Sequence, residues 1–156
     1  MSDEPDDHPG VLVFPPLLFL ICVGVGFAAY LIRPSRFGFA MGRRGVGVLL
    51  ILGAAALALW AQRTMRAAGT NIRPDLPATA IVATGPFART RNPLYLSLLA
   101  IYAGIGIMLA SRTFLAVVVP FALVLHFGVV LREERYLEAK FGDVYTSYKA
   151  RVRRWL

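Results

Sequence analysis

Four long apolar runs dominate the pattern of hydrophobic and polar positions along the chain. They cover residues 11–32, 45–61, 94–110 and 113–131, and none of them contains Lys, Arg, Asp or Glu. At ~1.5 Å of rise per residue, helices of these lengths approach or exceed the ~30 Å hydrocarbon core of a bilayer. The pattern therefore predicts an all-α fold, a polytopic membrane helical bundle with about four transmembrane helices.

The polar segments between the runs are short, and they predict connections within a single domain covering residues 1–156. Residues 1–10 are acidic and contain two prolines, which predicts a disordered tail. Residues 62–83 hold arginines, prolines and an aspartate, and they allow two interpretations. They form either a plain interfacial loop or a lid over a site, since long ordered loops usually serve a function. Residues 84–156 carry the polar motifs and are expected to be the catalytic half.

The C-terminal segment has the spacing of an amphipathic helix. Gly142 suits the end of the helix that leaves the membrane. Beyond it, Tyr145, Tyr148, Val152 and Trp155 recur at intervals of three and four residues, with lysine and arginine between them. This pattern predicts a C-terminal amphipathic helix at the membrane interface, with its aromatic residues in the interface and its cations toward lipid phosphates.

Composition and charge support the same class of protein. Hydrophobic residues make up 57% of the chain and charged residues 17%, against about 45–50% and about 25% in soluble domains. The net charge is +8, and the arginines flank the apolar runs, as expected beside anionic lipid headgroups. We therefore expect membrane lipids as partners and no nucleic acid. Cys22 is the only cysteine, so no disulfide framework is available and no metal site is expected.

Two polar clusters border the apolar runs, at residues 84–95 and 131–148. Proline in the first cluster favours an ordered turn that leads into a helix beginning at Pro93. Ser111 and Arg112 make a very tight turn between the last two runs, and Pro120 is expected to kink the run that follows. Because these two runs form an antiparallel hairpin, the clusters should return to the same face of the membrane.

The residues of these clusters resemble a known family. The string TGPF…TRNPLYL, followed by REERYLEAKFGDVYTSY, is similar to the isoprenylcysteine carboxyl methyltransferase and phospholipid methyltransferase family of membrane enzymes, over about residues 68–155. The resemblance implies transfer of a methyl group from S-adenosylmethionine (SAM). It also implies SAM contacts at Gly85, Pro86, Phe87, Asn92, Ser97, Leu98, Leu99, Ala100 and Glu133.

The chemistry of SAM adds further candidates. Its ammonium group needs a carboxylate, which Glu133 or Glu134 can supply. Its carboxylate needs donors, which Arg91 or backbone amides of the turn can supply, and its adenine needs an aromatic or apolar slot such as Phe87 and Tyr95. The catalytic candidates are Arg91, Asn92 and Glu133, and no general base is assigned. His126, seven residues before Glu133 on the same helix, is expected to line the same cavity.

Two positions depart from the family pattern. Many members have histidine where this chain has Asn92, so a titrating imidazole cannot act there, although an amide still donates and accepts hydrogen bonds. Ser97 stands where the family usually has glycine, and its side chain narrows the space for a ligand. Gly104 and Gly106 resemble a family Gly-x-Gly motif, but helix packing is the preferred interpretation for both.

The preferred function is that of an integral membrane methyltransferase acting on a lipophilic acceptor: a prenylcysteine-like carboxylate, a phospholipid amine or another amphiphile. The alternatives are a non-catalytic adaptor that binds anionic lipid and a protein partner, and a membrane oxidoreductase of similar architecture. Since SAM is cytosolic, the site is expected to face the cytoplasm. If the source is bacterial, the protein is expected in the inner membrane. Residues 33–44 then lie outside despite four arginines, against the positive-inside tendency.

Overall fold

The computed structural model describes residues 8–35 and 42–156, and it confirms the all-α prediction. Most of the expected tail at residues 1–10, and residues 36–41 of the connector, lie outside the described residues. No strand is present in the described part of the chain. The helical elements in order are α1 (Pro15–Ile32), α2 (Arg43–Ala67), η1 (Gly85–Ala88), α3 (Pro93–Leu109), α4 (Arg112–Ala116), α5 (Val118–Leu125), η2 (His126–Val130), α6 (Leu131–Phe141) and α7 (Asp143–Arg151).

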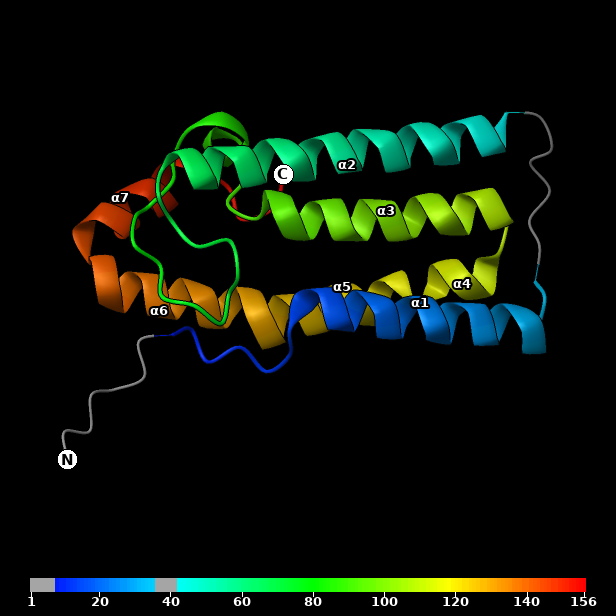
Figure 1. The fold of residues 1–156 in the computed structure, drawn as a ribbon. Helices are drawn as coiled ribbons and strands as arrows, with labels where there is room; N and C mark the ends of the chain where they lie inside the picture. Colours follow the sequence, from blue (N-terminus) through cyan, green and yellow to red (C-terminus); the bar gives the residue numbers. More distant parts are fainter. Residues whose placement is uncertain (1–7, 36–41) are drawn as a thin grey trace.

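The long helices lie side by side and form a bundle (Figure 1). Three of them are long and apolar enough to cross a membrane: Pro15–Ile32, Arg43–Ala67 and the continuous segment Arg112–Phe141. The remaining apolar run forms α3, a shorter helix of 17 residues. Large hydrophobic side chains on the outer faces of α1 and α2 are exposed, as a lipid-facing surface requires. The protein is therefore a helical membrane bundle.

Small residues allow α2 and α3 to approach closely. A Cβ atom added at Gly47 would lie 2.8 Å from the carbonyl oxygen of Gly104, and one added at Gly104 would lie 3.0 Å from the carbonyl oxygen of Gly47. A Cβ added at Gly106 would meet the side chain of Leu115 at 2.5 Å. The expected packing role of these glycines is confirmed, because no larger residue fits at these helix contacts without movement.

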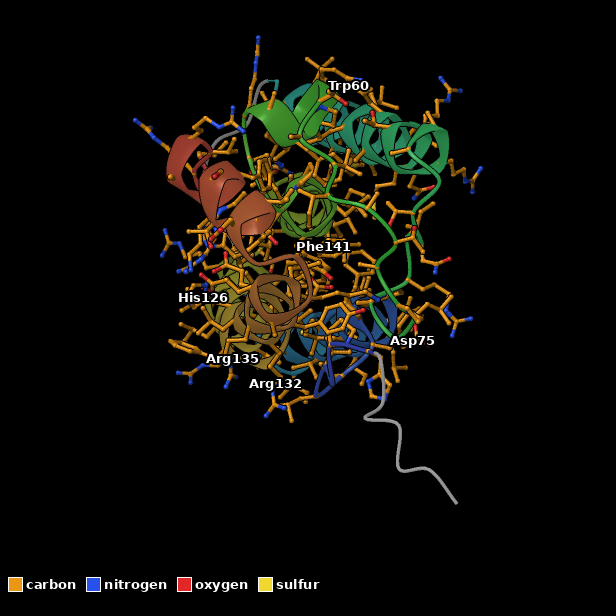
Figure 2. The ribbon with its side chains drawn as sticks, turned by 90° about the vertical axis from the view of Figure 1, so that its left-hand side faces the viewer. Trp60, Asp75, His126, Arg132, Arg135 and Phe141 are labelled. Carbon is orange, nitrogen blue, oxygen red and sulfur yellow. The ribbon has the colours of Figure 1, made fainter. Side chains whose placement is uncertain are left out.

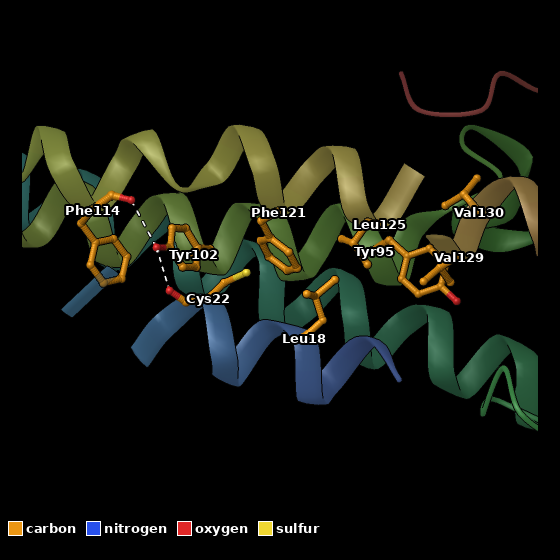
Figure 3. Packing of buried hydrophobic residues seen from close by; sticks show 9 residues of the cluster. All are labelled: Leu18, Cys22, Tyr95, Tyr102, Phe114, Phe121, Leu125, Val129 and Val130. Carbon is orange, nitrogen blue, oxygen red and sulfur yellow. Dashed lines mark hydrogen bonds between the residues drawn. The ribbon is translucent and has the colours of Figure 1, made fainter. Parts of the chain in front are cut away.

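Aromatic side chains fill the centre of the bundle (Figure 3). The buried ring of Tyr102 stacks on Phe114 with centroids 4.5 Å apart. Its hydroxyl group lies 3.1 Å from the carbonyl oxygen of Cys22 in α1 and 3.2 Å from that of Phe114 in α4. A Cβ at Gly26 would meet the same hydroxyl group. Tyr102 thus joins α1 and α4 to α3.

The predicted hairpin forms with a tight turn. Ala110 ends α3 in the left-handed region at φ 51°, and the Ser111 hydroxyl accepts a hydrogen bond from the Phe114 amide at 3.1 Å to start α4. The kink expected at Pro120 appears as a break at Val117, since proline cannot donate to the preceding turn and its ring disturbs it. The helix then widens into the π-helical turn η2 before α6 begins.

The C-terminal helix differs from the prediction in length and orientation. It was expected to continue through Val152 and Trp155, but α7 ends at Arg151 and Val152 is extended, with φ −121° and ψ 131°. Tyr145 and Tyr148 are buried in the protein instead of lying in the lipid interface. Trp155 packs against the core and its ring lies 6.2 Å from that of His126. The backbone of Arg153 and Arg154 bonds to the loop before α3, which holds the end of the chain against the protein.

Candidate active site

The two polar clusters meet at one end of the bundle, as the hairpin predicts. In Figure 1 this is the end where the loop after α2, the start of α3, and α6 and α7 come together. The Tyr95 hydroxyl, in the first turn of α3, donates a hydrogen bond to Oε1 of Glu133 in α6. Arg91 Nη1 lies 3.2 Å from Glu134 Oε1. Segments about forty residues apart in sequence therefore share one site.

Glu134 is a buried carboxylate held by two arginines. Its side chain is only 7% exposed. Arg154 donates to both carboxylate oxygens, from Nε to Oε1 at 2.9 Å and from Nη2 to Oε2 at 2.8 Å. Arg91 approaches from the other side. A buried carboxylate needs such paired, bidentate donors, because an uncompensated charge in the interior is strongly unfavourable.

Arg91 retains polar atoms without a hydrogen bond, although its guanidinium contacts both Glu134 and Tyr145. Its side chain is 8% exposed, and its Nε and Nη1 are buried without a hydrogen bond to any described residue. The contact of Nη1 with Glu134 at 3.2 Å is thus an ion pair without good hydrogen-bond alignment. Buried donors nearly always find a partner. The Arg91 guanidinium is therefore suited to bind an anionic group in the adjoining cavity.

A cavity with about 890 Å³ of empty space, its opening included, lies against these residues. One part of the wall is polar and aromatic, and includes Arg91, Tyr95 and Glu133. The rest is largely apolar and is lined by Met65, Ile72, Pro74, Leu76, Ala78, Ala80, Ile81, Val82, Leu94 and Leu137. The cavity thus combines a charged end with an apolar part.

The segment from Thr70 to Val82 covers the cavity, which supports the interpretation as a lid. Hydrogen bonds fix its shape: the Thr79 amide donates to Thr70 Oγ1 at 3.1 Å, and Asn71 Nδ2 donates to the Pro77 carbonyl at 2.8 Å. The Ala78 amide donates to the Tyr136 hydroxyl of α6 at 3.1 Å. These bonds hold an irregular segment across the space between α2 and α6.

Two tyrosines of α7 close another side of the cavity. The Tyr148 hydroxyl donates to the carbonyl oxygen of Phe87 at 2.8 Å, which ties α7 to the turn before α3. Burial, with a smaller contribution from the nearby Glu134 carboxylate, raises the pKa of Tyr145 to about 12. Burial also raises the pKa of Tyr148. Both phenols are therefore neutral at physiological pH and able to donate hydrogen bonds.

The structure brings half of the predicted site residues to the cavity wall. These are Phe87, Arg91, Asn92, Tyr95, Glu133 and Glu134. Gly85 and Pro86 do not line it; Gly85 packs against α2 instead, where a Cβ would lie 2.9 Å from Thr64 Oγ1. The Ser97 hydroxyl donates to the Pro93 carbonyl at 2.8 Å, and Leu98 and Leu99 pack against the core. Ala100 is half-buried away from the lining.

The expectation for His126 is wrong. It lies in a separate apolar groove with Leu96, Leu99 and Trp155. In the end view of Figure 2, His126 and Asp75 of the lid lie on opposite sides of the bundle. The π-helical turn η2 begins at His126 and ends before Glu133, and its wider turn breaks the seven-residue repeat that would have put both side chains on one face.

Several cavity residues were missed. Tyr136 and Leu137 follow Glu133 by three and four residues, so the helical period alone places them on the same face, and this signal was available. Leu94 lines the cavity from the first turn of α3. Nothing in the local pattern marks Arg154, because its contact with Glu134 depends on the return of the chain after α7.

Comparison with known proteins agrees with this geometry. A family model described as Phospholipid methyltransferase matches residues 43–144, roughly two thirds of the chain. The chain belongs to the phospholipid methyltransferase family. The matched region runs from the start of α2 into α7 and includes most of the residues that line the cavity, but not α1, Tyr145, Tyr148 or the C-terminal residues. Membership identifies the protein as a membrane methyltransferase in general.

A shorter bacterial protein is similar in sequence to part of this chain. An "Uncharacterized protein" of Haemophilus influenzae is 46% identical over 63 residues, which is 40% of this chain and 100% of that protein. Its description assigns no activity. It therefore adds a bacterial relative to the phospholipid methyltransferase family match without narrowing the substrate.

Proposed function

We propose that the cavity binds S-adenosylmethionine and that the protein transfers its methyl group to a lipophilic acceptor. The observation that carries this proposal is the presence, in one cavity, of a half-buried carboxylate at Glu133 and of Arg91, whose Nε and Nη1 make no hydrogen bond to the described residues. An amino-acid group has an ammonium and a carboxylate at one end, and it requires both kinds of partner. The family match supplies the reaction class.

The residues present fit SAM. Glu133 accepts one hydrogen bond from the Tyr95 hydroxyl, and the remaining lone pairs of its carboxylate can accept from an ammonium group. Nε and Nη1 of Arg91, which make no hydrogen bond to the described residues, suit a carboxylate, and a charge-assisted pair of this kind is stronger than a neutral hydrogen bond. Phe87 and Tyr95 offer aromatic surface for adenine.

SAM supplies an electrophilic methyl group on a sulfonium centre. The protein contributes binding, alignment and exclusion of water. Glu133 and Arg91 fix one end of the ligand, while the lid, with Ile72 and Leu76 among its lining residues, limits the access of water. Asn92 donates its side-chain amide to the Arg154 carbonyl at 2.9 Å. Asn92 therefore acts by positioning the turn. Because no general base is assigned, the acceptor atom must already carry an available lone pair when it binds.

The apolar part of the cavity favours an acceptor with a hydrocarbon chain. Met65, Leu94 and Leu137 lie on its wall at the ends of apolar helices. A prenylcysteine-like carboxylate, a phospholipid amine and another amphiphile all meet this requirement. We propose that the acceptor reaches the cavity from the membrane, where its apolar part is dissolved.

Calorimetric titration of the purified full-length protein with SAM tests the proposal. Wild-type protein should show saturable binding, and Glu133→Gln should weaken it by at least about tenfold, because a buried charge-assisted hydrogen bond is lost. Glu138→Gln is the matched control: Glu138 lies on the same helix, pairs with Lys149 at 2.8 Å and does not line the cavity. It should bind SAM as the wild type does.

A folded wild-type protein that does not bind SAM would refute the proposal and favour a membrane adaptor. The acceptor is identified by incubating membranes with methyl-labelled SAM and tracing the label into extracted lipids and proteins. Label that appears in an aqueous metabolite alone would contradict a lipophilic acceptor.

A further inference from the structure

The last residues of the chain form a segment, residues 152–156, which we call the C-terminal strap. After α7 ends at Arg151 the strap runs back beside the turn before α3. The Arg91 amide donates to the Arg153 carbonyl at 3.0 Å, and Thr90 and Arg153 form an isolated parallel β-bridge. The strap therefore belongs to the wall that carries Arg91, although the family match ends before it.

The next strap residue reaches both polar clusters. The Arg154 carbonyl accepts hydrogen bonds from Asn92 Nδ2 at 2.9 Å and from Thr90 Oγ1 at 3.3 Å. Its guanidinium binds Glu134 through two hydrogen bonds. The hydrogen bond to Glu134 is the main reason why the pKa of Arg154 is raised, so the guanidinium remains positively charged. One residue thus fixes the backbone turn and the buried acid together.

The charges of this cluster explain why Arg154 matters for the cavity. Without Arg154, the nearest cation to the buried Glu134 carboxylate is Arg91, and the two would neutralise each other. With Arg154 bound through both of its hydrogen bonds, Glu134 is already paired, and Nε and Nη1 of Arg91 lack hydrogen bonds to the described residues. Arg154 and Arg91 thus face the single carboxylate of Glu134, while Glu133 on the same wall is bonded to Tyr95.

We propose that Arg154 is a positioning residue: it binds Glu134 through two hydrogen bonds, so that Nε and Nη1 of Arg91, which make no hydrogen bond to the described residues, are left for the carboxylate of SAM. The inference rests on the proposed function, since it names the group that fixes the ligand's carboxylate. Arg154 itself does not line the cavity. Its effect on binding should therefore depend on Glu134 and on the ligand's carboxylate.

The test compares two ligands by calorimetry: SAM, and decarboxylated SAM, which lacks the carboxylate. In the full-length protein, Arg154→Gln should lower the affinity for SAM by about tenfold or more, which is the loss expected for one charge-assisted bond. The affinity for decarboxylated SAM should stay nearly unchanged. Arg153→Gln is the matched control, because Arg153 is exposed and joins the strap through its backbone. It should change neither affinity.

A second variant separates positioning from a general structural role. In the double variant Arg154→Gln with Glu134→Gln, Arg91 has no carboxylate to neutralise, so the affinity for SAM should recover relative to Arg154→Gln alone. Unchanged SAM binding in Arg154→Gln, an equal loss for both ligands, or no recovery in the double variant overturns the inference. If Arg154→Gln does not fold, Arg154→Lys takes its place, with a smaller but still carboxylate-dependent loss expected.

Failure of the proposed function has a different signature. In that case the wild-type protein binds neither SAM nor decarboxylated SAM, and no variant changes this. If the wild type binds SAM but Arg154→Gln does not discriminate between the ligands, SAM binding stands and only the role of Arg154 is lost.

Discussion

At the scale of single residues, Gly85 shows how a motif position can serve packing. Its backbone has φ +57°, a region that residues with a Cβ rarely adopt. An added Cβ would also lie 2.9 Å from Thr64 Oγ1 and 3.2 Å from Trp60 Nε1. The sequence suggested a ligand contact at Gly85, because the motif is visible and the neighbouring helix is not. Phe87 and Arg91 of the same motif do reach the cavity.

Gly85→Ala should lower the free energy of unfolding by about 1–2 kcal/mol, the cost of a left-handed conformation for alanine, with a further loss from the contact with α2. The measurement is thermal or denaturant unfolding of the purified protein. Gly24→Ala is the control, because Gly24 is helical and a Cβ there meets nothing within 4 Å. It should be neutral or stabilising. Equal stability of both variants would contradict the role assigned to Gly85.

At the scale of elements, the π-helical turn η2 sets the rotation of α6. It lies between the apolar helix α5 and the helix that carries Glu133 and Glu134. Such turns hold an additional residue compared with an α-helix and often occur near functional sites. The two helices of the hairpin were predictable, because two long apolar runs joined by the tight Ser111 turn must run antiparallel. The π-turn was not, because its residues follow an ordinary helical pattern.

Deletion of Phe127 should convert η2 to a regular α-helical turn and rotate α6 by about 100° relative to α5. This would move Glu133 away from Tyr95 and abolish SAM binding. Phe127 is 60% exposed, so its side chain contributes little packing. Phe127→Ala, which keeps the chain length, should bind SAM normally. Wild-type affinity in the deletion variant would show that the register of α6 is not set by η2.

The C-terminal strap marks the limit of sequence-based prediction at this scale. The spacing of Tyr145, Tyr148 and Trp155 favours a continuous helix, and the local sequence contains no stop signal at Arg151 such as glycine or proline. The helix ends because Arg153 and Arg154 bind the distant turn. A contact between residues more than sixty positions apart cannot be read from periodicity.

At the scale of the whole molecule, charge is unevenly distributed between the two ends of the bundle. The segments 62–91 and 132–156, at the cavity end, hold twelve of the seventeen Lys and Arg residues. Ser35 lies at the opposite end, where its carbonyl accepts from the Arg112 amide at 2.8 Å. The positive-inside rule therefore favours a cytoplasmic cavity, despite the arginines of residues 33–44.

Labelling of single cysteines in intact bacterial cells should establish the orientation. On a Cys22→Ser background, a membrane-impermeant maleimide should label Ser35→Cys from outside. Ser147→Cys, on the exposed side of α7, should react only after the cells are opened. The reverse pattern would place the cavity outside, away from cytosolic SAM, and would contradict the proposed function.

The hydroxyl group of Tyr102 joins α1 to a partner that is made much later. Cys22, whose carbonyl it contacts, precedes it by 80 residues. At about 5–20 residues per second of synthesis, α1 waits roughly 4–16 s in the bilayer before Tyr102 is translated. During this interval Gly26 and Cys22 lack the contacts that Tyr102 later provides. The helix α1 can remain in the bilayer during this interval, because its backbone groups are hydrogen-bonded within the helix. Insertion of the first span and assembly of the bundle are consequently separate events.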